Sequence, residues 1–324
     1  MVSDNARASL LMLGSMAAFV MNDMLVKAAT ASIEPAQVMA LRGVAASFLL
    51  LGFGAWRNAL PGRSGWFHPL LLCRVVADIG TTICYISALR HLPLANASAI
   101  FQALPLTITL GAALFLGEPV GWRRWLAIGI GFLGVLVIIR PAAEGFNVYA
   151  VLVLASVAFA AARDLVTRRM PADISSLHVA STTSVAVCLV GFLLLPVVGW
   201  KPMTPTLWVF LLLAAFAVAT GYCLIVAAMR IGDLGFVAPF RYSMLIFAFL
   251  FGWLVFGEAP DALELVGAAV VVGSGLYMFR REKRKHRPPL AVVADVDART
   301  ASQAVAQSQP STDLQPATTN SLNR

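Results

Sequence analysis

The stretch LANASAIFQALPLTITLGAALFLGE, from Leu94 to Glu118, decides the fold, because the chain holds a second version of it. The second version, LGFVAPFRYSMLIFAFLFGWLVFGE, runs from Leu234 to Glu258, and the two align without a gap at a shift of 140 residues. The same shift matches Phe19 with Phe159, well upstream of both stretches. A fixed internal period of this kind indicates that half of the protein was duplicated.

The composition predicts an integral membrane protein. Of the 324 residues, 59% are hydrophobic and 12% are charged, with a mean hydropathy of +0.81, whereas soluble domains carry about 25% charged residues. The net charge of +8 does not indicate a nucleic-acid partner, because the basic residues stand at the ends of apolar runs, as membrane topology requires. The expected partners are a lipid bilayer and a small-molecule substrate.

No motif for a metal, a cofactor or catalysis is found. The four cysteines lie inside apolar runs without CxxC or Cys/His spacing, which is typical of small core side chains; they are Cys73, Cys84, Cys188 and Cys223. The sequence also lacks a Walker A motif, a nucleophile constellation and HExxH. We therefore expect neither a cofactor nor a metal, and neither an enzyme nor an ATP-driven pump.

Ten segments are long and apolar enough to cross a bilayer as helices, which takes about 20 residues each. They are Ser9 to Ala28, Gln37 to Trp56, His68 to Ala88, Ala95 to Leu116, Arg124 to Ile139, Val148 to Thr167, Leu177 to Val198, Thr206 to Ala228, Gly235 to Phe256 and Leu263 to Phe279. The predicted fold class is all-α and integral to the membrane, with residues 8–140 and 148–280 as two five-helix repeats. The polar segment 288–324 is predicted to be a disordered cytoplasmic tail.

The basic residues set the predicted orientation. Fourteen Lys and Arg residues fall on one side of the membrane and four on the other, the four being Lys27, Arg90, Arg140 and Lys201. By the positive-inside rule both termini are cytoplasmic, which in a bacterium places the chain in the inner membrane. Because each repeat has an odd number of spans, the second repeat is inverted, an arrangement common in secondary transporters.

Ionisable residues at membrane depth are costly, so each is a candidate for function. Asp78 is the leading candidate for a carboxylate that binds a proton or a cationic substrate group, and Arg74 lies one turn away on the same face. A permanent Arg74–Asp78 ion pair that only fixes packing is the alternative. Asn22 and Asp23 come late in the first span, where an interfacial pair between Asp23 and Lys27 is an equally good explanation.

The second repeat carries its own polar residues. Arg163 and Asp164 occupy the location that Asp23 has in the first repeat, and snorkelling to the interface is their alternative. Arg241, with Tyr242, lies inside the ninth span without an acid in helical reach, so its partner is a substrate group, Asp78 or Asp164, unless it too snorkels. Gln102 stands beside a helix-weakening proline in the fourth span, as Arg241 does in the ninth.

The aromatic residues and the small residues each allow two interpretations. The aromatic side chains on these helices, among them Tyr85 and Tyr222, form either a stacking cage for a flat ligand or ordinary core. The glycines of the fifth and tenth spans suit close helix packing and allow a homodimer contact. Glu118 and Glu258 end equivalent spans, and we expect them to cap or tether the following helix.

The ten spans and the twin endings Phe115-Leu116-Gly117-Glu118 and Val255-Phe256-Gly257-Glu258 resemble the drug/metabolite transporter superfamily, specifically its EamA-type members, over about residues 8 to 282. The resemblance implies a central cavity lined by spans one, three, four, six, eight and nine. Those spans carry the candidate substrate-binding residues Asn22, Asp78, Tyr85, Gln102, Arg163, Tyr222, Arg241 and Tyr242, and the candidate coupling residues Asp78, Asp23 and Asp164.

The expected function is secondary active transport by alternating access, with riboflavin uptake as the leading substrate hypothesis. Arg-Tyr-Ser at Arg241 to Ser243 and Arg-Arg-Glu at Arg280 to Glu282 are similar to alphaproteobacterial members that import riboflavin or S-adenosylmethionine. An exporter of amino acids or drugs, or an S-adenosylmethionine importer, is the alternative within this class. A non-transporting membrane scaffold or receptor is the alternative outside it.

Overall fold

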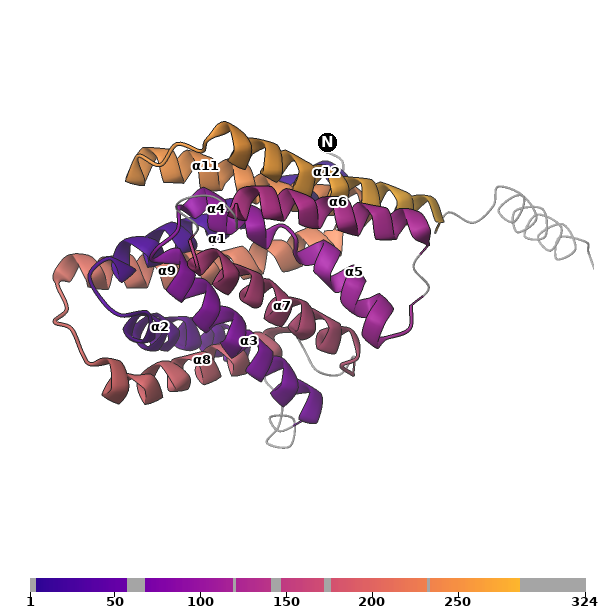
Figure 1. Ribbon diagram of the computed structural model, residues 1–324. Helices are drawn as coiled ribbons and strands as arrows, with labels where there is room; N and C mark the ends of the chain where they lie inside the picture. The colour runs from indigo at the N-terminus through magenta and orange to yellow at the C-terminus, as the bar shows by residue number, and fades with distance from the viewer. Residues whose placement is uncertain are drawn as a thin grey trace, which may run out of the picture. The chain divides into compact units, whose positions relative to one another are not determined.

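A computed structural model describes residues 4–56, 68–118, 121–140, 147–171, 176–231 and 234–285. The regular elements in these ranges are helices (Figure 1). They are α1 (Asp4–Thr30), α2 (Pro35–Trp56), α3 (Pro69–Leu89), α4 (Leu94–Phe101), α5 (Leu104–Phe115), α6 (Trp122–Ile139), α7 (Tyr149–Arg168), α8 (Ser176–Val198), α9 (Pro205–Ile231), α10 (Leu234–Val237), the 3-10 helix η2 (Ala238–Tyr242), α11 (Ser243–Phe256) and α12 (Ala262–Lys285). The account below concerns the compact unit Met1–Arg280. The predicted tail, 288–324, lies outside the described residues.

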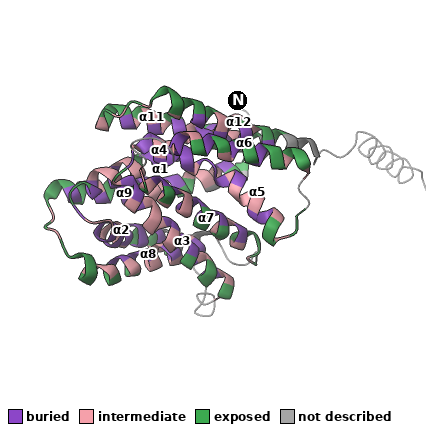
Figure 2. Ribbon diagram, viewed as in Figure 1, coloured by how far each residue is buried: buried purple, intermediate pink, exposed green. Residues whose placement is uncertain are grey.

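The described helices confirm an all-α, ten-helix membrane protein. Nine are long and apolar enough to cross a bilayer, with α4 and α5 counted together as Leu94–Phe115, and Ala262–Met278 in α12 is a shorter apolar helix. Exposed residues lie on many helices, as Figure 2 shows in green, and large apolar residues are among them. Phe48, Phe115 and Val197 are more than three-quarters exposed. Such surfaces suit lipid, because water would penalise so much exposed apolar area.

The fourth and ninth spans are broken at equivalent positions. α4 ends at Phe101 and α5 begins at Leu104, while η2 interrupts the ninth span and ends at Tyr242, which the 140-residue shift matches with Gln102. Proline explains the weakness of both helices, since it donates no backbone N–H and crowds the preceding turn. The predicted weakening beside Gln102 is confirmed, and the ninth span adds a short 3-10 segment.

The recurring Gly-Glu ending has a local cause. Gly117 and Gly257 have positive φ values of 66° and 68°, a left-handed conformation that glycine adopts without a side-chain clash. The next backbone N–H folds back onto the helix: that of Glu118 donates to Ala112 O at 3.2 Å, and that of Glu258 donates to Gly252 O at 3.0 Å. Each motif stops its helix and satisfies a terminal carbonyl.

Helices from the two halves of the chain pack on each other in matched pairs. α1 packs along α9, α3 packs along α7, and α2 packs along α8. The 140-residue shift relates α1 to α7, α3 to α9 and α2 to α8. The contact of α1 with α9 is therefore equivalent to the contact of α7 with α3. The contact of α2 with α8 joins two helices that are equivalent to each other. This pattern places α1, α3, α7 and α9 together in the middle of Figure 1.

The small-residue helices α6 and α12 use their glycines within the chain. A Cβ atom built on Gly134 would lie 2.9 Å from Gly267 O, and one built on Gly267 would lie 2.8 Å from Gly134 O. The close packing predicted for these spans therefore joins α6 to α12. The homodimer stays a prediction.

Candidate functional site

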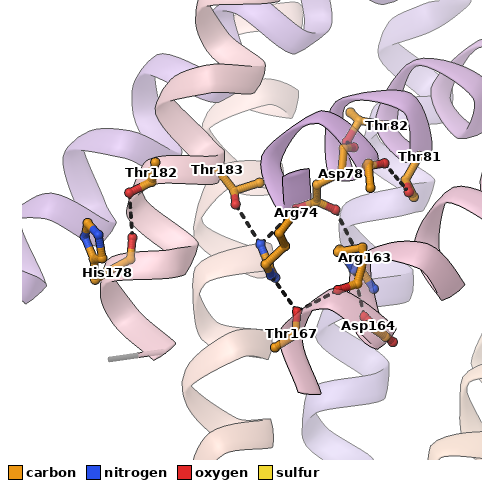
Figure 3. Close-up of polar contacts among 11 residues, drawn as sticks. Arg74, Asp78, Thr81, Thr82, Arg163, Asp164, Thr167, His178, Thr182 and Thr183 are labelled. Carbon is orange, nitrogen blue, oxygen red and sulfur yellow. Dashed lines mark hydrogen bonds and ion pairs between the residues drawn. The ribbon is translucent and has the colours of Figure 1, made fainter. Parts of the chain in front are cut away.

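Two groups of polar side chains meet between the central helices. The first, here called the Asp78 cluster, consists of Arg74 and Asp78 from α3 with Arg163 and Asp164 from α7. Figure 3 shows Arg163 directed at Asp78, and Arg74 reaching between Thr183 and Thr167. Local spacing supplies part of this cluster, because residues four apart share a helix face. The packing of α3 on α7 supplies the rest.

The distances show which contacts hold the cluster. Arg163 Nη1 donates to Asp78 Oδ1 at 2.8 Å, and Arg163 Nε donates to Asp164 Oδ1 at 2.8 Å. Arg74 Nη1 lies 3.7 Å from Asp78 Oδ2, which confirms the predicted pair on α3. Arg74 also donates to the hydroxyls of Thr183 at 2.8 Å and Thr167 at 3.0 Å. Asp78 is buried at 7% exposure and is held between two guanidinium groups.

The second group, here called the Asp23 cluster, consists of Asn22, Asp23, Arg42 and Tyr85. Arg42 Nη1 donates to Asn22 Oδ1 at 2.7 Å, and Asn22 Nδ2 donates to Asp23 Oδ1 at 2.9 Å. The Tyr85 hydroxyl donates to Asp23 Oδ2 at 3.0 Å. Donors from α1 and α3 therefore contact the carboxylate, and α2 is linked to it through Asn22.

The alternative interfacial pair between Asp23 and Lys27 is wrong. Lys27 Nζ donates to Glu258 Oε1 and to Leu92 O, both at 2.5 Å. Glu258 Oε2 also accepts the backbone N–H of Leu94 at 2.8 Å. We call this set of contacts the Glu258 tether.

The expectation that Glu258 caps or tethers the following helix is also wrong. Its carboxylate instead ties the ends of α1 and α4 to the end of α11. The following helix, α12, is capped by a reciprocal pair: Glu264 N donates to Asp261 Oδ1 at 2.9 Å, and Asp261 N donates to Glu264 Oε2 at 3.0 Å. Such a capping box satisfies two terminal donors at once.

Further ion pairs gather at the same end of the bundle. Glu34 contacts Arg90 at 2.8 Å and Lys201 at 2.7 Å, and Arg140 pairs with Asp261. Hydrogen bonding to Lys201, helped by Arg90, holds the pKa of Glu34 below its ordinary value of 4.5. Near the opposite helix ends, Glu118 and Arg168 lie 3.7 Å apart with both side chains about half exposed. The ion pairs are therefore closer at the first end of the bundle than at the opposite end.

The two helix breaks contact each other. Gln102 Nε2 donates to the backbone carbonyl of Arg241 at 3.4 Å, so a side chain beside one break reaches the backbone of the other. The Arg241 side chain is exposed, and within the described residues no carboxylate lies within ion-pair distance of it. The predicted direct pairs with Asp78 and Asp164 are therefore absent from the described residues, and contact of Arg241 with a substrate group stays a prediction.

Aromatic rings lie beside the polar clusters. Phe19 and Tyr222 meet edge to face with centroids 5.3 Å apart, and Tyr85 meets Phe101 in the same way at 5.3 Å. Tyr222 is exposed, and its ring belongs to α9, which packs along α1. The rings therefore pack against one another in pairs, and the stacking cage for a flat ligand stays a prediction.

Tyr242 occupies a different environment from the other candidates. It is buried at 7% exposure, and its hydroxyl lies 1.8 Å from where a Cβ atom on Gly275 of α12 would be. The ring therefore packs into a gap that glycine leaves in α12. Tyr242 thus packs against α12, and its predicted contact with substrate stays a prediction.

Three residues that contact these charged groups are not among the site residues predicted from the sequence. Arg42 joins the Asp23 cluster, and Thr183 and Thr167 complete the surroundings of Arg74. An arginine inside an apolar span was the available signal for Arg42. The threonines carry no such signal, because a hydroxyl is common in membrane helices. Within the described ranges, no group of three His, Cys, Asp or Glu side chains has the arrangement of a metal site.

The balance of positive and negative charges indicates which ligands the candidate site suits. The two clusters and Arg241 together carry four guanidinium groups and three carboxylates. An isolated charge at mid-membrane costs at least about 2.5 kcal/mol, so unpaired groups there require water, a partner or a ligand. The arrangement suits a ligand with an anionic or carbonyl group that accepts from arginine.

A sequence profile of the EamA-like transporter family matches the chain twice, at residues 6–140 and 147–280. Among curated proteins, the chain is similar to a riboflavin transporter of Vibrio cholerae, at 32% identity over 69% of this chain and 74% of that protein. It is similar to the pseudopaline exporter CntI of Pseudomonas aeruginosa, at 30% identity over 87% of this chain and 100% of the exporter. It is also similar to an S-adenosylmethionine uptake transporter of Rickettsia prowazekii, at 26% identity over 81% of this chain and 89% of that protein.

Proposed function

The chain belongs to the EamA-like transporter family, and from this premise we propose that it imports riboflavin across the bacterial inner membrane as a secondary active transporter. Its relatives are named as transporters rather than enzymes, so it is a multi-pass membrane transporter of a small molecule. Both termini are proposed to be cytoplasmic. A scaffold or receptor role loses its support with this family membership.

The proposed mechanism is alternating access between two inverted repeats. The two profile matches fall close to the predicted repeats 8–140 and 148–280. The matched packing of α1 on α9 and of α3 on α7 supports a two-fold relation between the halves. Two halves related in this way can exchange conformations of nearly equal energy around a shared site.

The substrate hypothesis is supported by the aromatic rings and by Arg241. Riboflavin is a flat heterocycle with ring carbonyl oxygens, which accept hydrogen bonds from guanidinium groups. We propose that Arg241 donates to these carbonyls and that Tyr222 stacks on the ring. The single observation that carries this proposal is an exposed arginine at a helix break, without a carboxylate partner in the described part of the chain.

A second candidate function is export of an anionic metabolite. The excess of one guanidinium group over the carboxylates favours it, as does the alignment of the pseudopaline exporter over 87% of this chain. Import of S-adenosylmethionine and export of amino acids or drugs are tested by the same experiment. The substrates therefore need to be compared in one assay.

The test is substrate counterflow in proteoliposomes that contain the purified full-length chain. Liposomes loaded with unlabelled riboflavin should take up labelled riboflavin faster than protein-free liposomes. Unlabelled pseudopaline, S-adenosylmethionine and amino acids are then added outside as competitors. Arg241→Ala should abolish counterflow while leaving membrane insertion intact, and Arg241→Lys should restore little, because lysine lacks the planar donor fork.

The matched control is Arg123→Ala, which removes an exposed arginine that stacks on Trp122 outside both clusters. That variant should transport like the wild type. Absence of riboflavin counterflow in the wild type would exclude riboflavin as substrate, and strong competition by another compound would identify its replacement. Unchanged flux in Arg241→Ala would show that Arg241 does not contact the substrate.

A further inference from the structure

We propose that Asp23, rather than Asp78 or Asp164, is the carboxylate that binds and releases the coupling proton. This inference rests on the proposed carrier function and narrows three candidate coupling residues to one. It follows from the different hydrogen-bond partners that the structure gives to the three acids.

Asp78 and Asp164 are both paired with a cation. Arg163 donates to each of them at 2.8 Å, and Arg74 lies 3.7 Å from Asp78. Protonating either acid would leave the two guanidinium groups of the cluster with a single carboxylate between them, and a buried charge that loses its partner is costly. These two carboxylates are therefore fixed counterions.

Asp23 accepts hydrogen bonds from neutral donors instead. Asn22 Nδ2 and the Tyr85 hydroxyl occupy its two oxygens, at 2.9 and 3.0 Å. Neither donor carries a positive charge that protonation of Asp23 would leave without a partner. Of the three acids, Asp23 is thus the one for which gaining a proton breaks no ion pair in the described residues.

The elements around α1 supply few other charges near Asp23. α2 contributes Arg42, α3 contributes Tyr85 and, farther along, Arg74 and Asp78, α9 contributes Tyr222, and η2 contributes Arg241 and Tyr242. α4, α10 and α11, which also contact α1, contain no titratable side chain. On α1 itself, Lys27 is engaged by Glu258.

Asn22 links this carboxylate to an arginine. Its side-chain oxygen accepts from Arg42 at 2.7 Å while its nitrogen donates to Asp23, so the amide lies between the two charges. Arg42 Nε is buried and has no hydrogen-bond partner among the described residues. A substrate group that draws Arg42 away from Asn22 would weaken the bridge, and the free energy of the ionised Asp23 would change with it. Substrate binding and protonation are coupled in this way.

The proton step is balanced within the site. A proton from water on one side of the membrane binds Asp23 Oδ2 and forms the neutral acid. The Tyr85 hydroxyl then turns from donor to acceptor. After the site opens to the other side, the proton leaves to water and the carboxylate regains both hydrogen bonds. No further reactant is needed.

The test compares Asp23→Asn with Asp4→Asn in proteoliposomes, with riboflavin as the probe. Asp23→Asn should retain counterflow, which needs no net proton movement, and should lose accumulation driven by a pH gradient. Asp4→Asn removes an exposed carboxylate at the start of α1, outside both clusters, and should keep the pH-driven accumulation of the wild type. Gradient-driven accumulation in Asp23→Asn would overturn the inference, whereas missing counterflow in the wild type would count against the proposed substrate.

A second measurement is independent of the substrate. Infrared difference spectra of the purified chain, taken between acidic and neutral pH, report the carbonyl stretch of any carboxylic acid that titrates. We expect a band from a membrane-embedded acid in the wild type and in Asp164→Asn, and its loss in Asp23→Asn. A band that persists in Asp23→Asn, or that vanishes in Asp164→Asn, would assign the proton to another acid.

Discussion

At the scale of single residues, the structure pairs Asp78 with cations and Asp23 with neutral donors. Asp78 joins α3 to α7 through Arg163, and Figure 3 shows that Arg74 extends the same network to Thr183 on α8. A buried ion pair of this kind contributes little net stability when complete. Removing one partner, however, strands a charge in a medium that solvates it poorly.

Asp78→Asn should therefore destabilise the protein by about 3–5 kcal/mol, because Arg163 and Arg74 lose their shared counterion. Thermal unfolding in detergent measures the change. Thr183→Val is the comparison, since it removes a hydrogen-bond acceptor of Arg74 but no charge, and it should cost about 1.5–3 kcal/mol. Equal unfolding temperatures for the two variants would mean that Asp78 does not hold these helices together.

At the scale of helices, the breaks and ends of the duplicated spans have diverged. Gly257 and Gly117 end their helices in the same conformation, yet only the second repeat's glutamate makes a compact tether in the described residues. Lys27 in that tether also lies 5.1 Å above the ring of Phe256. We therefore predict that, in an alternating carrier, the tethered end is the closed gate.

Glu258→Gln should open the tethered end, because the amide loses the charge that attracts Lys27 and accepts a weaker hydrogen bond from Leu94. A cysteine at Ser98, which is fully buried in α4, reports the opening through its reaction with a membrane-impermeant maleimide in right-side-out vesicles. The reporter requires a background without the native cysteines. We expect faster labelling with Glu258→Gln and no change with Glu118→Gln; equal labelling in both would show that the tether does not close this end.

At the scale of the whole molecule, the Lys and Arg residues in the connections between spans predict the orientation in the membrane. The α8–α9 connection and the end of α7 are separated by one span, α8, so they face opposite sides of the bilayer. The positive-inside rule assigns the Arg168–Arg169 end of α7 to the cytoplasm and the connection at Pro202 to the other side.

Single cysteines at these two points test the orientation. Pro202→Cys should react with an impermeant maleimide in intact cells, and Arg169→Cys should react only in inside-out vesicles. Both positions are exposed, so reactivity reports the side of the membrane rather than burial. The reverse pattern would place both termini outside and would require the proposed direction of transport to be reconsidered.

The sequence by itself determined the ten helices, the duplication and the location of the two breaks. Lipid offers no hydrogen bonds to the backbone, so an apolar run of sufficient length must form a helix. Pro105 and Pro239 weaken their helices through chemistry that is local to the chain. The Arg74–Asp78 pair was likewise predictable, because four-residue spacing fixes neighbours on one helix.

Only the tertiary structure decided which charges meet across helices. Asp78 pairs with Arg163, 85 residues away, and Lys27 pairs with Glu258, 231 residues away. Tyr242 stands beside Arg241 in the sequence but packs into the gap at Gly275. Spacing along the chain cannot predict these contacts, because they depend on how helices from the two halves cross, and that crossing is set by the sum of many weak packing contacts rather than by any one motif.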